Sequence, residues 1–185
     1  ETYVAIANGV LNPANFESNP DGRATGFGLF IKAGAKEAGS GGNVEFFALH
    51  GATDAPTVDV VARGVATLVD NAAYGDITGY IPVPPASYTL DVKDASGTVT
   101  VASYTADLSG LADGSAVVFA SGFLSPANDQ NGEAFGLYPA QVHLFLAHGG
   151  DGRDKQRHVV GQTAGHDGVD GDLFNRGRAP ERWNG

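Results

Sequence analysis

The sequence predicts an all-β protein whose main unit is an immunoglobulin-like antiparallel β-sandwich. Three observations lead to this prediction. Apolar residues make up 42% of the chain and charged residues only 17%, so most of it should fold around a core. Glycine occurs 27 times, between short segments rich in Thr, Val and Ala, as in strands joined by tight turns. No helical spacing of apolar residues persists beyond two turns.

An internal repeat sets the domain organisation. Residues 3–15 (YVAIANGVLNPAN) resemble residues 116–128 (AVVFASGFLSPAN). Each copy continues through a polar loop into an aromatic–glycine element, at residues 27–30 and 135–138. The closing segment of a repeat therefore occurs twice.

The opening segment of the repeat also occurs twice. Residues 44–51 (VEFFALHG) resemble residues 142–149 (VHLFLAHG), so only one complete unit lies between them. The predicted organisation is residues 1–33 as closing strands of a partial repeat, 34–42 as a linker, 43–139 as a complete sandwich, 140–149 as the opening strand of a further partial repeat, and 150–185 as a glycine-rich divergent tail.

The complete unit contains seven strand candidates at regular intervals, as an immunoglobulin-like sandwich requires. Residues 88–92 and 98–101 alternate apolar and polar side chains, which is typical of half-buried strands. Residues 94–97 (DASG) predict a hairpin turn between them. The predicted strands are 44–49, 57–62, 65–69, 77–83, 87–93, 98–105 and 115–121.

Three segments of this unit resemble a known family. Residues 47–60 (FALHGATDAPTVDV) join an apolar strand ending in His to Asp-Ala-Pro and an alternating strand, and residues 80–92 (YIPVPPASYTLDV) and 115–121 supply two further hallmarks. In these segments the chain resembles the tandem domain of unknown function 4397, found as immunoglobulin-like repeats on exported bacterial and archaeal proteins. The resemblance implies a β-sandwich at the cell surface or outside the cell, and no established activity. The third copy departs from the pattern after Gly149.

Charge and cysteine content exclude several classes of protein. The net charge is −10, and residues 1–148 carry 15 acidic against 5 basic side chains, which argues against a nucleic-acid partner. The chain has no cysteine, so it forms no disulfide, thiolate zinc site or thiol nucleophile. No apolar run approaches the roughly 20 residues that span a bilayer.

Two histidines occupy the same place in two copies of the repeat. His50 and His148 each end an opening strand, and a turn containing Asp54 and Pro56 follows the first. A histidine there could bind a metal or act as a base. A residue that recurs at one place in two copies favours a structural role, in which the ring hydrogen-bonds the turn.

No catalytic arrangement is predicted. Asp59 and Asp91 are expected at outward positions of alternating strands, and Asp54 can cap a turn with its own side chain. The sequence lacks a G-x-S-x-G elbow, a phosphate-binding glycine loop and an H-E-x-x-H motif. We therefore expect a protein that is not an enzyme.

The tail suggests a calcium site, and the aromatic residues raise the question of a sugar-binding face. Residues 149–154 begin like a glycine-rich calcium nonapeptide, and residues 167–172 cluster three carboxylates. The calcium hypothesis rests on Asp151, Asp154, Asp167, Asp170 and Asp172; no other cofactor is expected. The aromatic candidates Phe27, Phe30, Tyr80, Tyr88, Phe135 and Tyr138 favour a core role, because they fall at strand positions that a sandwich must fill.

The partial repeats point to a function. Closing strands without an opening strand leave apolar faces and backbone edges unpaired. Either the chain ends meet in one permuted sandwich, or strands add between molecules and build a filament or surface array. Residues 149–185 offer little core, which favours self-association. We expect a structural or adhesive extracellular protein; the alternative is a ligand-binding accessory domain of a larger secreted enzyme.

Overall fold

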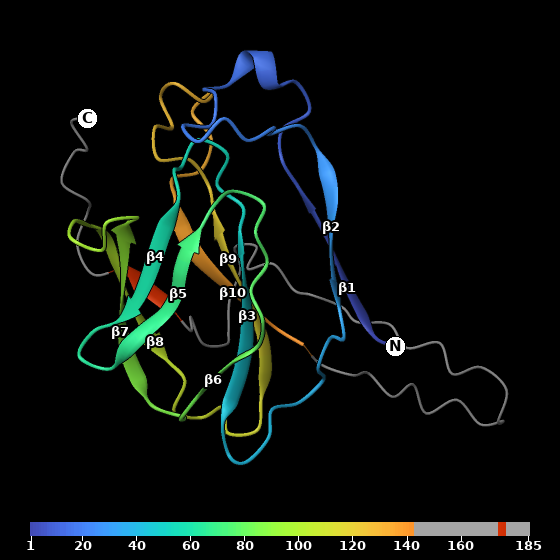
Figure 1. Ribbon diagram of the computed structural model, residues 1–185, viewed down its shortest axis with the longest axis vertical. Coiled ribbons are helices and arrows are strands. Elements are labelled where there is room, and N and C mark those ends of the chain that lie inside the picture. Colours follow the sequence, from blue (N-terminus) through green and yellow to red (C-terminus); the bar gives the residue numbers. More distant parts are fainter. Residues whose placement is uncertain (143–173, 177–185) are drawn as a thin grey trace, which may run out of the picture.

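The computed structural model describes residues 1–142 and 174–176 and shows an all-β fold in three layers (Figure 1). Two sheets face each other, with strand orders β10-β9-β3-β6 and β11-β8-β7-β4-β5, and a two-stranded ribbon, β1-β2, forms the third layer. The predicted all-β sandwich is confirmed. The sandwich strands are β3 (Val44–His50), β4 (Val58–Ala62), β5 (Ala66–Ala72), β6 (Ile81–Val83), β7 (Ser87–Asp94), β8 (Thr100–Asp107), β9 (Ser115–Ser121), β10 (Gly136–Gln141) and β11 (Phe174–Arg176).

One strand pair differs from the expected antiparallel pattern. β3 pairs with β9 in parallel, from Glu45 opposite Ser115 to His50 opposite Ala120. The other pairs between named strands in the described residues are antiparallel. The first and the penultimate strand of the unit thus lie side by side and point the same way, which brings the two ends of the sandwich together.

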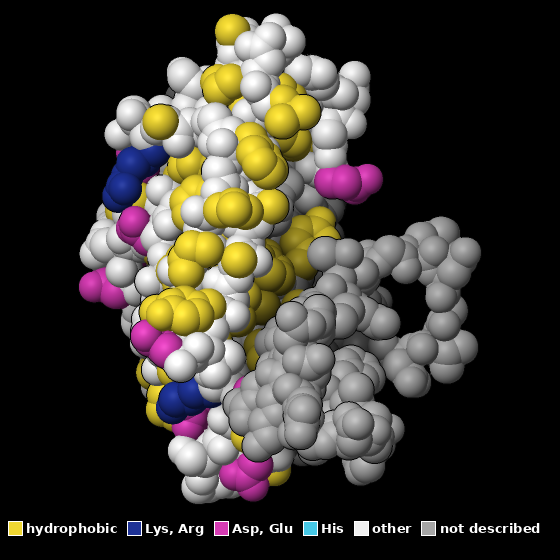
Figure 2. Space-filling view, turned by 90° about the vertical axis from the view of Figure 1, so that its right-hand side faces the viewer, with side chains coloured by type: hydrophobic (Ala, Val, Ile, Leu, Met, Phe, Trp, Pro, Cys, Tyr) yellow, Lys and Arg dark blue, Asp and Glu magenta, His cyan; other side chains and the backbone are white. Residues whose placement is uncertain are grey.

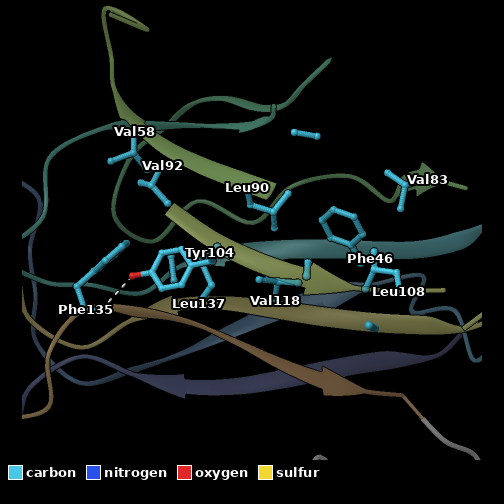
Figure 3. Packing of buried hydrophobic residues seen from close by; sticks show 14 of the residues in the cluster. Phe46, Val58, Val83, Leu90, Val92, Tyr104, Leu108, Val118, Phe135 and Leu137 are labelled. Atoms are coloured by element: carbon cyan, nitrogen blue, oxygen red, sulfur yellow. Dashed lines mark hydrogen bonds between the residues drawn. The ribbon is translucent and has the colours of Figure 1, made fainter. Parts of the chain in front are cut away.

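The sandwich core lies between the two sheets (Figure 3). Val118 and Leu137 from one sheet face Leu90 and Val92 from the other, and all four side chains are buried. Each such side chain contributes roughly 1.5–3 kcal/mol when it leaves water. The Tyr104 hydroxyl donates to the Phe135 carbonyl across the sandwich at 3.2 Å, so this buried hydroxyl is satisfied.

The ribbon consists of β1 (Tyr3–Asn8) and β2 (Gly28–Ala33), joined by a loop with a short 3-10 helix, η1 (Pro13–Asn15). It lies beside β3 in Figure 1. Its inner side chains, among them Ile6, pack with Phe47, Leu49 and Val117 in a second apolar cluster. β3 is therefore covered on both faces, which explains the run of four consecutive apolar residues, Phe46–Leu49, at its centre.

Segments outside the regular strands are also anchored. Residues 34–42, predicted as a flexible linker, contain no strand but are held by bonds from Gly39 N–H to the Asp113 carbonyl and from Gly42 N–H to the Asp113 carboxylate, both 2.8 Å. Within the predicted tail, β11 pairs with the edge of β8. No helix in the described residues has the length and apolar character needed to cross a membrane.

Candidate functional site

The ribbon is a structural copy of the closing hairpin of the sandwich. β1 aligns with β9 and β2 with β10, and all six residue pairs of one hairpin have their equivalents in the other, from Asn8–Gly28, matching Ser121–Gly136, to the far end. The sequence repeat therefore encodes the same strands in the same register.

Glycine fixes the bend that follows the first strand of each hairpin. Gly9 and Gly122 have φ of 97° and 85°, values that side chains other than glycine rarely adopt. A Cβ atom would lie 2.6 Å from the Gly26 oxygen at Gly9, and 2.5 Å from the Ala134 oxygen at Gly122. Both copies thus need glycine for its conformation and for the close approach of a second backbone.

The two copies differ in what covers them. β9–β10 buries one face in the sandwich core, with Ala116, Val118 and Leu137 all below 10% exposed. The equivalent face of β1–β2 points outward. Its side chains, Tyr3, Ala5, Ala7, Leu29, Ile31 and Ala33, are all exposed and all lack charge.

The largest exposed apolar side chains of the ribbon and its loop stand at positions that are buried or part-buried in the second copy. Leu29 is 67% exposed where Leu137 is 6% exposed, and Phe27 is 57% exposed where Phe135 is 6% exposed. Leu11, at 89%, corresponds to Leu124, which packs against the core. Figure 2 shows hydrophobic side chains running along this side of the molecule. We call this surface, formed by Tyr3, Leu11, Phe27, Leu29 and Ile31, the ribbon face.

The ribbon also has an unpaired edge. β9 lies between β10 and β3, whereas β1 pairs only with β2 among the described strands. The edge of β1 away from β2 corresponds to the edge where β9 accepts β3. Within the described part of the chain it therefore presents backbone groups without a strand partner, which favour addition of a strand.

Polar contacts fix the ribbon loop to the sandwich. The Asn19 side chain donates to the carbonyls of Thr53 and Ala55 at 3.0 and 2.9 Å, and it is buried. The Phe16 and Phe123 rings stack with centroids 5.7 Å apart. The loops of the two copies therefore meet at the same end of the molecule, together with a third loop, the turn after β3. We call the place where these three loops meet the junction.

The predicted turn residues lie at this junction. His50 is buried, and its Nε2 lies 3.0 Å from the Pro56 carbonyl oxygen, to which it donates. Burial lowers the pKa of His50, against the opposing influence of the Pro56 carbonyl. Asp54 does not contact His50 in any hydrogen bond of the described structure; its Oδ2 accepts the Ser125 N–H at 2.8 Å. His148 lies outside the described residues.

Asp59 and Asp91 point away from the core, as expected, but they are not solvent-exposed. They are 7% and 5% exposed, because neighbouring groups cover them. The Arg63 guanidinium makes two bonds to Asp91 at 2.8 and 2.6 Å and holds the pKa of that carboxyl below its usual value. Asp59 Oδ1 accepts the Asn71 N–H at 2.7 Å. Both carboxylates are therefore structural partners.

The aromatic candidates divide into three groups. Phe135 is buried in the core as predicted. The core prediction is wrong for Phe27 and Tyr138, which are 57% and 41% exposed. Phe27 lies in the loop just before β2, and Tyr138 lies on the face of β10 opposite to the buried Leu137. The remaining three are part-buried: Phe30, Tyr80 and Tyr88.

A group of acidic side chains that the sequence did not reveal lies at the junction. One carboxylate oxygen from each of Glu17, Asp54 and Asp129 lies within 4.8 Å of the others. These residues belong to three loops far apart in the sequence. Alignment of the two copies gives a signal in retrospect, since Asn15-Phe16-Glu17 and Asn128-Asp129 both place an acid soon after Pro-Ala-Asn. The calcium candidates Asp151, Asp154, Asp167, Asp170 and Asp172 lie outside the described residues.

The fold and the junction define a β-sandwich domain with a second hairpin, the β1–β2 ribbon, docked against it. Residues 45–131 match the model of a family described as Domain of unknown function (DUF4397), which supports the assignment of the complete unit to that domain family. The matched segment begins in β3 and ends in the loop between β9 and β10. No curated protein and no solved structure matched the chain in the corresponding comparisons.

Proposed function

We propose that this chain is a non-catalytic structural or adhesive repeat protein of the cell exterior that assembles with other copies through β-strand complementation. One observation carries the proposal: the ribbon leaves open the face and the edge that its equivalent, β9–β10, fills within the complete unit.

The ribbon face supplies the driving force for association. Its large side chains include Leu29 and Ile31, at 67% and 52% exposed, and burying a side chain of this size contributes roughly 1.5–3 kcal/mol. Contiguous apolar patches of this kind mark interaction surfaces on soluble proteins. The outward strand positions carry no charge, so covering them buries no unpaired ion.

The strand that fits the edge of β1 is an opening strand of the repeat. Within the unit, β3 fills the equivalent place beside β9. Residues 142–148 (VHLFLAH) resemble β3 (VEFFALH) and would supply this strand from a second copy. Transferring the β3–β9 register places Leu144 opposite Tyr3, and His148 opposite Ala7, in a parallel pair. The contact is heterologous, so it propagates into a filament unless its rotation closes a ring.

Self-association is tested by light scattering after size exclusion, over a range of concentrations. We expect wild type to form concentration-dependent oligomers and the double variant Leu29→Lys, Ile31→Lys to remain monomeric, because the lysines keep the ribbon face in water. The matched control is Val65→Lys, at an apolar position that is also 67% exposed but lies outside the ribbon. A wild-type chain that stays monomeric at every concentration, or a control that loses assembly equally, contradicts the proposal.

The register is tested by disulfide trapping between two singly substituted proteins. The chain has no cysteine of its own, so Tyr3→Cys protein mixed with Leu144→Cys protein should form one mixed disulfide. Neighbouring strands lie about 4.8 Å apart, within the Cα separation of a disulfide. Phe145→Cys is the control, since its side chain would point to the opposite face. Equal trapping of both pairs contradicts the proposed register.

A further inference from the structure

The acidic group formed by Glu17, Asp54 and Asp129 joins three separate parts of the fold. Glu17 lies in the ribbon loop, Asp54 in the turn between β3 and β4, and Asp129 in the loop between β9 and β10. Hydrogen bonds tie the same loops together: Glu17 N–H donates to Asp129 Oδ1 at 2.8 Å, and the Asn128 side-chain amide donates to Glu17 Oε1 at 2.7 Å. A ligand at this point would therefore hold the ribbon to the sandwich.

Two of the three carboxylates are buried with oxygens that lack a donor. Asp129 is fully enclosed and Asp54 is 6% exposed. Among residues 1–142 and 174–176, Asp129 Oδ2 and Asp54 Oδ1 have no hydrogen-bond partner. None of the three acids forms an ion pair with a Lys, Arg or His of the described chain. A buried carboxylate with an open oxygen is costly unless a positive group or a proton meets it.

The electrostatics of Asp129 indicate negative charge that has no positive partner. Burial raises the pKa of Asp129, and the neighbouring Asp54 raises it further, while the Glu17 N–H opposes the shift. A cation between these oxygens would remove the repulsion without requiring either carboxyl to keep its proton.

We propose that Glu17, Asp54 and Asp129 bind a calcium ion, a divalent cation that prefers hard oxygen ligands. The bound ion would hold the ribbon against the sandwich. Calcium accepts carboxylate, carbonyl and water oxygens at about 2.3–2.6 Å, so two ligands on opposite sides of one ion lie roughly 4.6–5.2 Å apart. The three oxygens all lie within 4.8 Å of one another, so no pair is farther apart than two ligands of one calcium ion can be. Calcium also tolerates irregular geometry from loops, whereas magnesium demands a near-ideal octahedron. These three residues are not among the tail aspartates on which the sequence-based calcium hypothesis rests.

Thermal melting of the full chain in calcium chloride or EDTA tests the site. We expect 1 mM calcium to raise the Tm of wild type by about 5 °C or more, the shift for an ion present well above its Kd. The response should disappear in Asp129→Asn, whose amide can donate to Asp54 and so replaces the ion. Asp70→Asn, at an exposed carboxylate, is the matched control and should respond like wild type.

Two further proteins separate this site from other calcium binding and guard against a variant that fails to fold. A chain with all five tail aspartates replaced by Asn should keep the wild-type response. Glu17→Gln alters an exposed side chain and should weaken calcium affinity by roughly tenfold in titration calorimetry, since ligand charge tunes such sites. No shift in wild type overturns the proposal, as does an undiminished response in Asp129→Asn and Glu17→Gln. The site needs no self-association, so a monomeric chain with a calcium response would refute the proposed assembly and leave this inference standing.

Discussion

Replacing Gly122 by alanine tests the backbone geometry on which both copies of the hairpin depend. The residue has a φ of 85°, and an added Cβ would lie 2.5 Å from the Ala134 oxygen and 2.7 Å from its carbonyl carbon. The backbone at Ala134, just before β10, must then move. Two hydrogen bonds cross at this point, from Phe123 N–H to the Glu133 carbonyl and from Phe135 N–H to the Phe123 carbonyl, both 2.8 Å.

The expected loss follows from these two effects. A left-handed conformation costs a non-glycine residue about 1–2 kcal/mol. Weakening two backbone hydrogen bonds adds about 1 kcal/mol for each. Gly122→Ala should therefore lower the free energy of unfolding by roughly 3–4 kcal/mol. Gly64 supplies the reference, because its φ is 73° but nothing lies within 4 Å of an added Cβ. Gly64→Ala should thus show the conformational cost alone.

Urea denaturation followed by circular dichroism measures both variants, and the difference between them isolates the close approach. Gly9→Ala reproduces the strain in the ribbon, where an added Cβ lies 2.6 Å from the Gly26 oxygen. Because the core between the sheets contains no ribbon residue, this variant should expose the Phe27 amide to hydrogen exchange and leave the main transition in place. If Gly122→Ala costs no more than Gly64→Ala, the packing argument is wrong.

Two predictions concern His50. His50→Ala should lower the free energy of unfolding by roughly 1–2 kcal/mol, because it leaves the Pro56 carbonyl without its donor; an unchanged Tm would remove the turn-fixing role. Burial holds the pKa of folded His50 below that of the unfolded chain, so the unfolded state binds more protons between the two values. Wild-type stability should fall as the pH drops below about 6.5, and the slope should be shallower in His50→Ala in parallel urea titrations; identical slopes would contradict this assignment.

The strands could be predicted from sequence because alternation and turn residues are local signals. Ser115–Ser121 has the predicted boundaries, and β7 extends the prediction by one residue. The prediction for residues 77–83 is too long, since only Ile81–Val83 forms a strand of the ladder. Before it, the Thr78 hydroxyl accepts the Ala48 N–H at 2.8 Å, so a side chain takes the place of a backbone partner. A hydrogen bond in which a side chain replaces a backbone group does not alter the spacing of apolar residues, so the sequence pattern does not indicate it.

Strand direction and the acidic group could not be predicted from the same signals. The alternation of apolar and polar residues in a strand does not show whether its neighbour is parallel or antiparallel. In addition, the β3–β9 pair joins residues far apart along the chain. Glu17, Asp54 and Asp129 lie in loops, and nothing local shows that three loops converge. Phe27 shows a further limit. Like Phe135, it is followed by Gly-Leu and an aromatic residue, but Phe27 is 57% exposed and Phe135 only 6%, because exposure depends on the tertiary surroundings.

The likeness of β1 to β9 also bears on the order of events during folding. β3 must wait for a partner that is synthesised 70 residues later, whereas β1 has already emerged and carries the matching register. Loop closure alone favours the nearer segment by about 0.4 kcal/mol. We therefore expect β1 to compete transiently with β9 for pairing with β3. β9 then displaces β1, because β9 places Val118 in the core, whereas β1 has only Ala5 at the equivalent position. The sequence differences between β1 and β9 thus decide which of the two strands stays paired with β3 once both have been synthesised.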